Sequence, residues 1–593
     1  MLKKPHFLAM TILAVICLGA CNSTPPTNTP NKIDHLAIQS VIQLEPQDLF
    51  SAEQPLLKPD TFDQVLLALN TKSSIADINH LLYYLRAYSY FGPQKELTET
   101  QRRQLASQLV LLAQDTNINT NPRFQEQLAV TVYRYLNKDE YASSLTSLFP
   151  VLSRQLAHLQ NSDITNINDI ALWETLRTYG LLLNVARTKP EGELAKLLIE
   201  HRVDKPLLRF AASTNSIRNN NDWPRLNAYW ALAMYRLTLP SSTDGSTTQQ
   251  EQAIDDGIAK IATADVALRQ QAAQDAFTLG YHVNTSAGKK LCEDNASLCR
   301  IPELTSVLPH RHDCSMTLFI THQDLSKSEL EESCTKLTSQ EFYFHQLLES
   351  QLQPTANDNS DALEVVVFKN WSQYNAYGQL FYDIRTNNGG MYLEGTPQKV
   401  GNQARFFAFR QWWIEPKFAI WNLNHEYVHY LDGRFVKYGK FGHFPDSMVW
   451  WSEGLAEYVS KGDENQKAFK VAHENFEKAP DLATIFATTY KDGLDRTYKW
   501  SYLAVRYLAE KHPADLVQLS QYLKGDYFTG YKDLLKALSA HQEDYHLWLT
   551  ALLKQHPLPK EKTNSRLYKQ DRYSYRDYLT PDHLVFGEQH KHY

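Results

Sequence analysis

The sequence lacks several features that mark particular classes of protein. Its formal net charge is only −6 over 593 residues, so the basic excess of nucleic-acid-binding proteins is missing and we expect no nucleic-acid partner. After the first 20 residues there is no run of about 20 consecutive apolar residues, so we expect no membrane-spanning helix there. Apolar residues make up 43% and charged residues 21%, which argues against wholesale disorder. A chain of this length favours two or more domains.

The N-terminal segment has the pattern of an export signal. Two lysines precede a short apolar run, Phe7–Leu18, and the sequence Leu-Gly-Ala-Cys ends at Cys21. These four residues resemble the lipobox of bacterial lipoproteins, which implies cleavage before Cys21 and a lipid on its thiol. A plain secretory signal with an incidental cysteine is the alternative. We therefore expect a signal peptide in 1–20, a Pro-rich tether in 21–45, and an exported protein. The anchor would hold it at the outer membrane or cell surface, with partial release allowed.

Cysteines are scarce after the lipobox. Only four remain, and in an oxidising compartment four cysteines predict two disulfides. The short loops favour the pairs Cys292–Cys299 and Cys314–Cys334. Zinc binding by the four cysteines is an alternative, weakened because no CxxC pair is present.

The pattern of apolar residues divides the rest of the chain into two parts. Apolar residues recur near the helical period throughout 46–285, which predicts stacked helices of a solenoid type without a strict repeat. The second part, 286–593, contains four short β-branched and aromatic segments, which predict a small mixed sheet. One helix is expected between two of these strands, and helices follow the sheet. The sequence therefore predicts an α+β fold. The strand segments are 316–322, 362–370, 389–395 and 404–411.

The segment "NHEYVHYLDGRF" carries the first candidate chemistry. His425 and His429 are four residues apart, so on a helix both imidazoles lie on one face, with Glu426 beside them. This is the HExxH arrangement of zinc proteases, in which the glutamate is the general base. The alternative is a solvated histidine pair on a helix.

A second segment, "WWSEGLAEY", supplies the ligand that HExxH lacks. Catalytic zinc takes three protein ligands and one open position. Glu453 is therefore the candidate third ligand, and Glu457, one helical turn later, could hold a ligand imidazole through its other nitrogen. Ordinary surface carboxylates are the alternative for both residues.

Together these segments resemble the peptidase unit of bacterial collagenases, which are gluzincin metalloproteases. The upstream segment "NNGGMYLEG" occurs in the same order as in that family. The resemblance covers about residues 314–555 and implies a thermolysin-like zinc peptidase domain, preceded by a superhelical activator domain. It implies that the two histidines and Glu453 bind zinc, that Glu426 is the general base, and that Glu457 holds the imidazole of a zinc-binding histidine. It also implies that Gly389 and Gly390 lie on the strand that pairs with substrate and that Glu394 binds calcium.

Several functional readings follow. Met391 is followed by Tyr392 and not by the amine-clamping glutamate of related aminopeptidases, which favours an endopeptidase. A zinc aminopeptidase or oligopeptidase of the same clan, or an inactive surface-binding lipoprotein, are the alternatives. Tyr498 is the candidate donor to the developing oxyanion, and Tyr502 is its competitor. We expect a monomer that acts on a polypeptide such as collagen or gelatin. No collagen-recruiting module is recognised after the peptidase unit, so we expect cleavage of single collagen chains or other peptides, and the sequence does not decide action on native fibrils.

Overall fold

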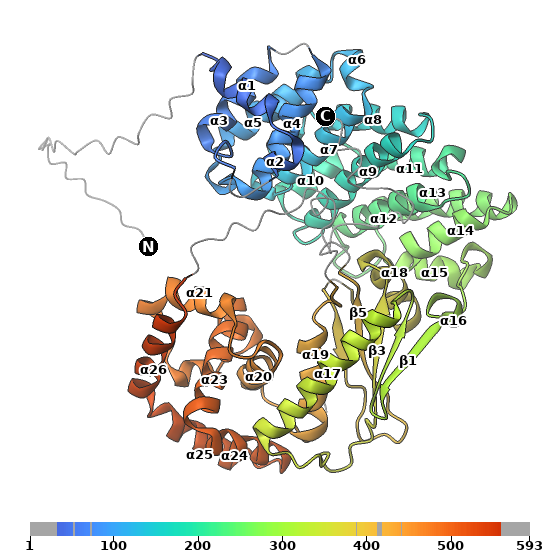
Figure 1. Ribbon diagram of the computed structural model, residues 1–593. Coiled ribbons are helices and arrows are strands. Elements are labelled where there is room, and N and C mark those ends of the chain that lie inside the picture. Colours follow the sequence, from blue (N-terminus) through green and yellow to red (C-terminus); the bar gives the residue numbers. More distant parts are fainter. Residues whose placement is uncertain are drawn as a thin grey trace, which may run out of the picture.

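The chain forms a helical first half and a second half built around a small sheet (Figure 1). The computed structural model describes residues 32–50, 54–71, 74–386, 388–411, 418–439 and 442–558. The expected signal, the lipobox cysteine Cys21 and most of the tether lie outside the described residues. The coarse prediction of an α+β protein, mostly helical with a small mixed sheet, is confirmed.

The first half is helical throughout its described part. Several of its helices begin at side-chain caps: Thr98 and Gln101 form a capping box at α5, and Thr248 and Glu251 form another at α13. Their apolar faces share one continuous core. The helices are α1 (His35–Gln43), α2 (Pro46–Leu49), α3 (Pro59–Leu69), α4 (Ile75–Phe91), α5 (Glu99–Leu112), α6 (Thr116–Asn119), α7 (Pro122–Tyr135), α8 (Phe149–Gln160), α9 (Asn166–Ala186), α10 (Glu193–Glu200), α11 (Asp204–Ala212), α12 (Trp223–Thr238), α13 (Gln249–Ala267), α14 (Gln271–Phe277), the π-helical η4 (Thr278–His282) and α15 (Ser286–Asp294).

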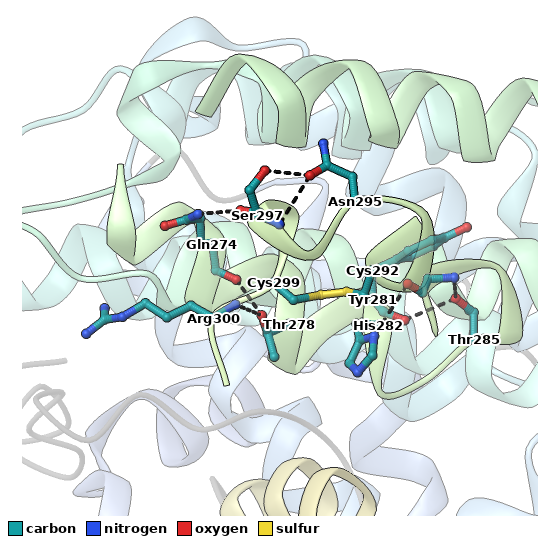
Figure 2. Close-up of a disulfide and its surroundings, with 11 residues drawn as sticks. Gln274, Thr278, Tyr281, His282, Thr285, Cys292, Asn295, Ser297, Cys299 and Arg300 are labelled. Carbon is teal, nitrogen blue, oxygen red and sulfur yellow. Dashed lines mark hydrogen bonds between the residues drawn. A yellow bond between two sulfur atoms is a disulfide. The ribbon is translucent and has the colours of Figure 1, made fainter. Parts of the chain in front are cut away.

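The core of the first half extends beyond the limit expected at residue 285. Leu298 belongs to this core, and the disulfide Cys292–Cys299 packs against it. Figure 2 shows this disulfide beside η4, where the backbone N–H of Arg300 donates to the hydroxyl of Thr278 at 2.9 Å. The segment after α15 therefore packs on the core of the helical half and belongs to it.

The second half contains a five-stranded mixed sheet in the order β1-β2-β3-β5-β4. The three central strands run parallel, and both edge strands are antiparallel to their neighbours. The strands are β1 (His310–Ser315), β2 (Leu318–His322), β3 (Leu363–Phe368), β4 (Met391–Leu393) and β5 (Ala404–Phe409). The strands predicted at 316–322, 362–370, 389–395 and 404–411 are all present.

Both faces of the sheet are covered, because successive side chains of a strand point to opposite faces. On β3, Val365 and Val367 belong to the core shared with the helices that follow the sheet, whereas Val366 and Phe368 belong to a smaller core with α18 (Trp371–Tyr382). The near-continuous apolar sequence of β3 is thus what a strand buried on both faces requires.

Two elements of the second half have no clear apolar pattern from which the sequence could predict them. Strand β1 is polar and mostly exposed, so it has no apolar alternation. Helix α17 (Lys327–Leu348) buries only a narrow stripe, including Leu330, Leu337 and Phe344, and is otherwise polar. The disulfide Cys314–Cys334 joins these two elements. Both disulfides are paired as expected, which leaves none of these four thiols for zinc.

The helices after the sheet form the left part of the second half in Figure 1. Within the described ranges, no helix has both the length and the apolar character needed to cross a membrane. The helices after the sheet are α19 (Leu423–Phe435), α20 (Val449–Lys461), α21 (Gln466–Glu474), α22 (Leu482–Phe486), the π-helical η10 (Asp495–Trp500), α23 (Ser501–Lys511), α24 (Pro513–Lys524), α25 (Phe528–Ser539) and α26 (Gln542–Gln555). A short helix, α16 (Leu304–Val307), comes before the sheet.

Candidate zinc centre

Helix α19 presents the two histidines of the HExxH segment on one face. Its apolar residues Val428 and Leu431 are buried in the core of the second half, which fixes the rotation of the helix. The rings of His425 and His429 then lie with their centroids 4.9 Å apart. Glu426 is partly exposed, and its Oε1 accepts a hydrogen bond from the side-chain amide of Asn422 at 3.1 Å. The predicted base therefore stands at the open side of the histidine pair.

Helix α20 brings Glu453 to the same point. Its Oε2 lies 3.1 Å from Nε2 of His425 and 3.6 Å from Nε2 of His429. The next residue is Gly454, where a Cβ would lie 2.6 Å from the carbonyl oxygen of Ser501. A side chain at this position would push α20 away from α23, so the glycine allows the close packing that positions Glu453.

The three side chains fit a zinc ion. Nitrogen and oxygen ligands at about 2.0–2.2 Å in tetrahedral geometry lie about 3.3–3.6 Å from one another. The measured separations of 3.1 and 3.6 Å from the carboxylate oxygen to the two imidazole nitrogens match this spacing. All three candidate ligand atoms lie within 4.8 Å of each other. The structure thus brings together the residues that the sequence proposed as ligands.

Glu457 lies behind the histidine, as expected for a residue that orients a ligand. Its Oε1 is 3.3 Å from Nδ1 of His425, the nitrogen that faces away from Glu453. The other contacts of this buried carboxylate are with Lys461, with Nζ of Lys499 at 3.0 Å and with the amide of Asn465 at 3.1 Å. Glu457 is therefore held in place from three sides while it faces the imidazole.

The charges at the site suit a divalent cation. Burial disfavours the imidazolium form of His425, but the hydrogen bond to Glu453 and the nearby carboxylate of Glu457 outweigh it and raise its pKa to about 10. Burial opposes ionisation of Glu453 too, yet His429 and His425 hold its pKa well below the usual value. The pKa of Glu457 is also lowered, against burial, by His425 and two lysines. Two carboxylates thus stay anionic beside two imidazoles, and a bound metal would take the place of the imidazolium proton.

The two candidate tyrosines are in different situations. The hydroxyl of Tyr502 is buried and donates to the carbonyl oxygen of Gly462 at 2.8 Å, which is a structural role. The ring of Tyr498 lies 6.1 Å from that of His425, and among the described residues its hydroxyl has no hydrogen-bond partner. Burial and the neighbouring Glu453 raise the pKa of Tyr498, so its hydroxyl keeps its proton. Of the two, Tyr498 is the one available to a substrate.

The glycines before β4 make room for neighbouring groups. A Cβ at Gly389 would collide with the indole of Trp421, and one at Gly390 would lie 3.0 Å from the carbonyl oxygen of Phe407. Strand β4 pairs with β5 on one side and is the last strand of the described sheet. Its outer edge is therefore one on which an extended peptide could pair.

Glu394 lies beside Gly433 of α19, one helical turn beyond the candidate ligand His429. Its Oε1 is so close to Gly433 that a Cβ there would collide with it. Three groups of possible metal-binding side chains occur within the described ranges, and Glu394 belongs to none of them. Calcium binding at Glu394 stays a prediction.

Some residues of the site were not identified from the sequence. Lys461 follows Glu457 by one helical turn, so an i,i+4 ion pair was a readable signal. Lys499 and Tyr490 reach the site from later segments. Tyr490 donates from its hydroxyl to Oε1 of Glu453 at 2.7 Å. No local pattern reveals such contacts, because they depend on how α20 packs against the segment that follows it.

Comparison with known proteins agrees with this geometry. The profile of a family described as Collagenase matches residues 270–548. A "Microbial collagenase" of Vibrio alginolyticus is 39% identical over 250 residues, which cover 42% of this chain and 30% of that protein. The corresponding protein of Vibrio vulnificus is 36% identical over 252 residues, again 42% of this chain and 30% of the relative. "Collagenase ColA" of Clostridium perfringens is 25% identical over 199 residues, 32% of this chain and 17% of the relative.

The chain therefore spans less than a third of the length of these curated relatives. The matched residues include the whole sheet, both segments of the candidate zinc centre and the helices up to α26. Over residues 270–548, this chain is similar to the bacterial collagenases.

Proposed function

We propose that this protein is a zinc metalloendopeptidase that hydrolyses peptide bonds in collagen-like or gelatin-like polypeptides. The observation that carries the proposal is the convergence of His425, His429 and Glu453 at the spacing of zinc ligands. The relatives named as collagenases favour this substrate class. The finer features of the fold, a thermolysin-like catalytic unit and a superhelical first half that engages long substrates, are part of the same proposal.

Each residue has a role that follows from its position. Zinc held by the three ligands would polarise the scissile carbonyl and lower the pKa of a water molecule. Glu426, on the open side of the site, accepts the proton of the attacking water and delivers it to the leaving nitrogen. Tyr498 donates a hydrogen bond to the carbonyl oxygen as negative charge develops there. Glu457 holds the imidazole of His425 in the orientation that directs Nε2 to the metal.

An endopeptidase fits the surroundings better than an aminopeptidase. An aminopeptidase needs a carboxylate beside the zinc to bind the free amine of its substrate. The candidate on this strand, Glu394, lies beside Gly433. Gly433 is one turn beyond His429, about 6 Å further along the helix axis. With Glu394 displaced from the metal position in this way, a chain can extend past the site along β4 in both directions.

The proposal is tested with an N-terminally blocked gelatin-derived peptide. The purified full chain should cleave this peptide internally, lose the activity on treatment with a chelator, and regain it when zinc is added back. An aminopeptidase would leave the blocked peptide intact but digest its unblocked form. An inactive binding protein would cleave neither form, even with zinc present, and this result would contradict the proposal.

We further propose that the mature protein is lipid-anchored at Cys21. Changing Cys21→Ser removes the thiol that accepts the lipid, so the variant should leave the membrane fraction or fail to be processed. Fractionation and intact-mass measurement of both proteins check this, with Cys17→Ser as the control because that residue lies within the signal. Equal membrane association and equal mass in the variant and the wild type would disprove the anchor.

Calcium is the last part of the proposal. Glu394 offers an oxygen ligand of the kind that Ca²⁺ prefers, close to the end of α19. A calcium ion there would support the helix that carries both histidines, although it would not take part in the chemistry.

A further inference from the structure

The zinc-binding carboxylate of Glu453 is engaged on both of its oxygens. Oε2 faces Nε2 of His425 and Nε2 of His429, at 3.1 and 3.6 Å. Oε1 accepts a hydrogen bond of 2.7 Å from the hydroxyl of Tyr490. The two oxygens are thus distinguished by their surroundings, and only Oε2 points to the place where the metal would bind.

Tyr490 reaches this buried carboxylate from the surface. Glu453 is 5% exposed, whereas Tyr490 as a whole residue is 57% exposed. The ring therefore lies at the open side of the zinc centre, and its hydroxyl extends inward. A tyrosine hydroxyl, with an ordinary pKa of about 10, is a hydrogen-bond donor at neutral pH. It can donate to Oε1 whether or not a metal is present.

The backbone around Tyr490 is held by local contacts. It begins a short 3-10 turn, η9 (Tyr490–Asp492), that carries a capping box between Thr489 and Asp492. Asp492 also forms an ion pair with Arg496 at 2.5 Å, which ties the turn to η10. Because η10 carries Tyr498, one short segment supplies both tyrosines of the site. The hydroxyl of Tyr498 is available for substrate, whereas that of Tyr490 is bonded to the ligand.

We propose that Tyr490 is a positioning residue that holds Glu453 in a one-oxygen binding mode toward zinc. A carboxylate can bind zinc through one oxygen or both, and binding through both fills coordination space that catalysis needs for water. The hydrogen bond from Tyr490 keeps Oε1 away from the metal. This inference rests on the proposed zinc peptidase function, since it describes how one ligand of that site is held.

The test is Tyr490→Phe, which removes the hydroxyl and keeps the ring. Tyr527→Phe is the matched control, because Tyr527 is similarly exposed (66%) and stands just before α25. Zinc affinity of the metal-free full chain is measured by competition with a chromogenic chelator. Loss of a partner that orients a metal ligand weakens binding by about 10–100-fold. We expect a loss of this size for Tyr490→Phe and none for Tyr527→Phe.

A second readout reports the binding mode directly. Cobalt(II) replaces zinc in such sites, and its visible absorption weakens when the number of ligands rises from four to five. In Tyr490→Phe the released Oε1 should join the metal and reduce this absorption. Wild-type zinc affinity and an unchanged cobalt spectrum in Tyr490→Phe would overturn the inference, even if hydrolysis fell, because Tyr490 would then act on substrate. A wild-type chain that binds no zinc would instead overturn the proposed function, and this inference with it.

Discussion

The variant His429→Ala should lose most of its zinc. The metal would keep only His425 and Glu453, and two protein ligands do not hold zinc in a site that needs three. We expect zinc affinity to fall by more than about 100-fold. This exceeds the loss caused by removing a residue that only hydrogen-bonds to a metal-binding side chain. Hydrolysis should disappear with the metal. Metal analysis of the purified variant after dialysis gives the zinc content per chain.

The matched control for this variant is His546→Ala. His546 is an exposed histidine on α26, and the centroid of its ring lies 4.9 Å from that of Phe476. This substitution should leave the zinc content unchanged. If His429→Ala retained a full equivalent of zinc, the ligand assignment would be wrong.

The variant Glu426→Gln should keep its zinc and lose turnover. Glu426 is not one of the three groups that converge on the metal position, so its replacement leaves the ligands intact. Glutamine has the same shape, but its amide cannot accept the proton of the attacking water. General-base catalysis contributes about 10²–10⁴-fold, and kcat should fall by a factor in this range. Zinc content is measured on the same preparation as kcat.

Glu474→Gln provides the control for this substitution. It makes the same chemical change on an exposed residue of α21 and should alter neither zinc content nor kcat. Substantial turnover by Glu426→Gln would place the general base elsewhere. Loss of zinc in Glu426→Gln would show that Glu426 helps to form the metal site.

Local periodicity explains how much of the site was predictable. The HExxH segment and the segment WWSEGLAEY each lie within one helix. The helical period alone determines that His425 and His429 share a face. The strands buried on both faces have strong apolar signals as well. By contrast, β1 is a polar edge strand, and it depends on pairing with β2 and on the disulfide Cys314–Cys334. A polar sequence held by long-range contacts has no local signal to read.

The sequence by itself indicated the candidate residues of a zinc centre and their spacing, the α+β class and the favoured pairing of four cysteines. The spacing of His425 and His429 within one helix and the short loop between Cys292 and Cys299 depend on near neighbours, which the order of residues already specifies. Only the tertiary structure decided that Tyr502 is structural, that Tyr498 is available, and that Tyr490 bonds to Glu453. The hydrogen bonds of Tyr490 and Tyr502 join α20 to segments about 40 residues later. Gly454 helps by letting α20 pack closely against α23. Packing between distant segments is set by the whole core, so no short stretch of sequence could reveal it.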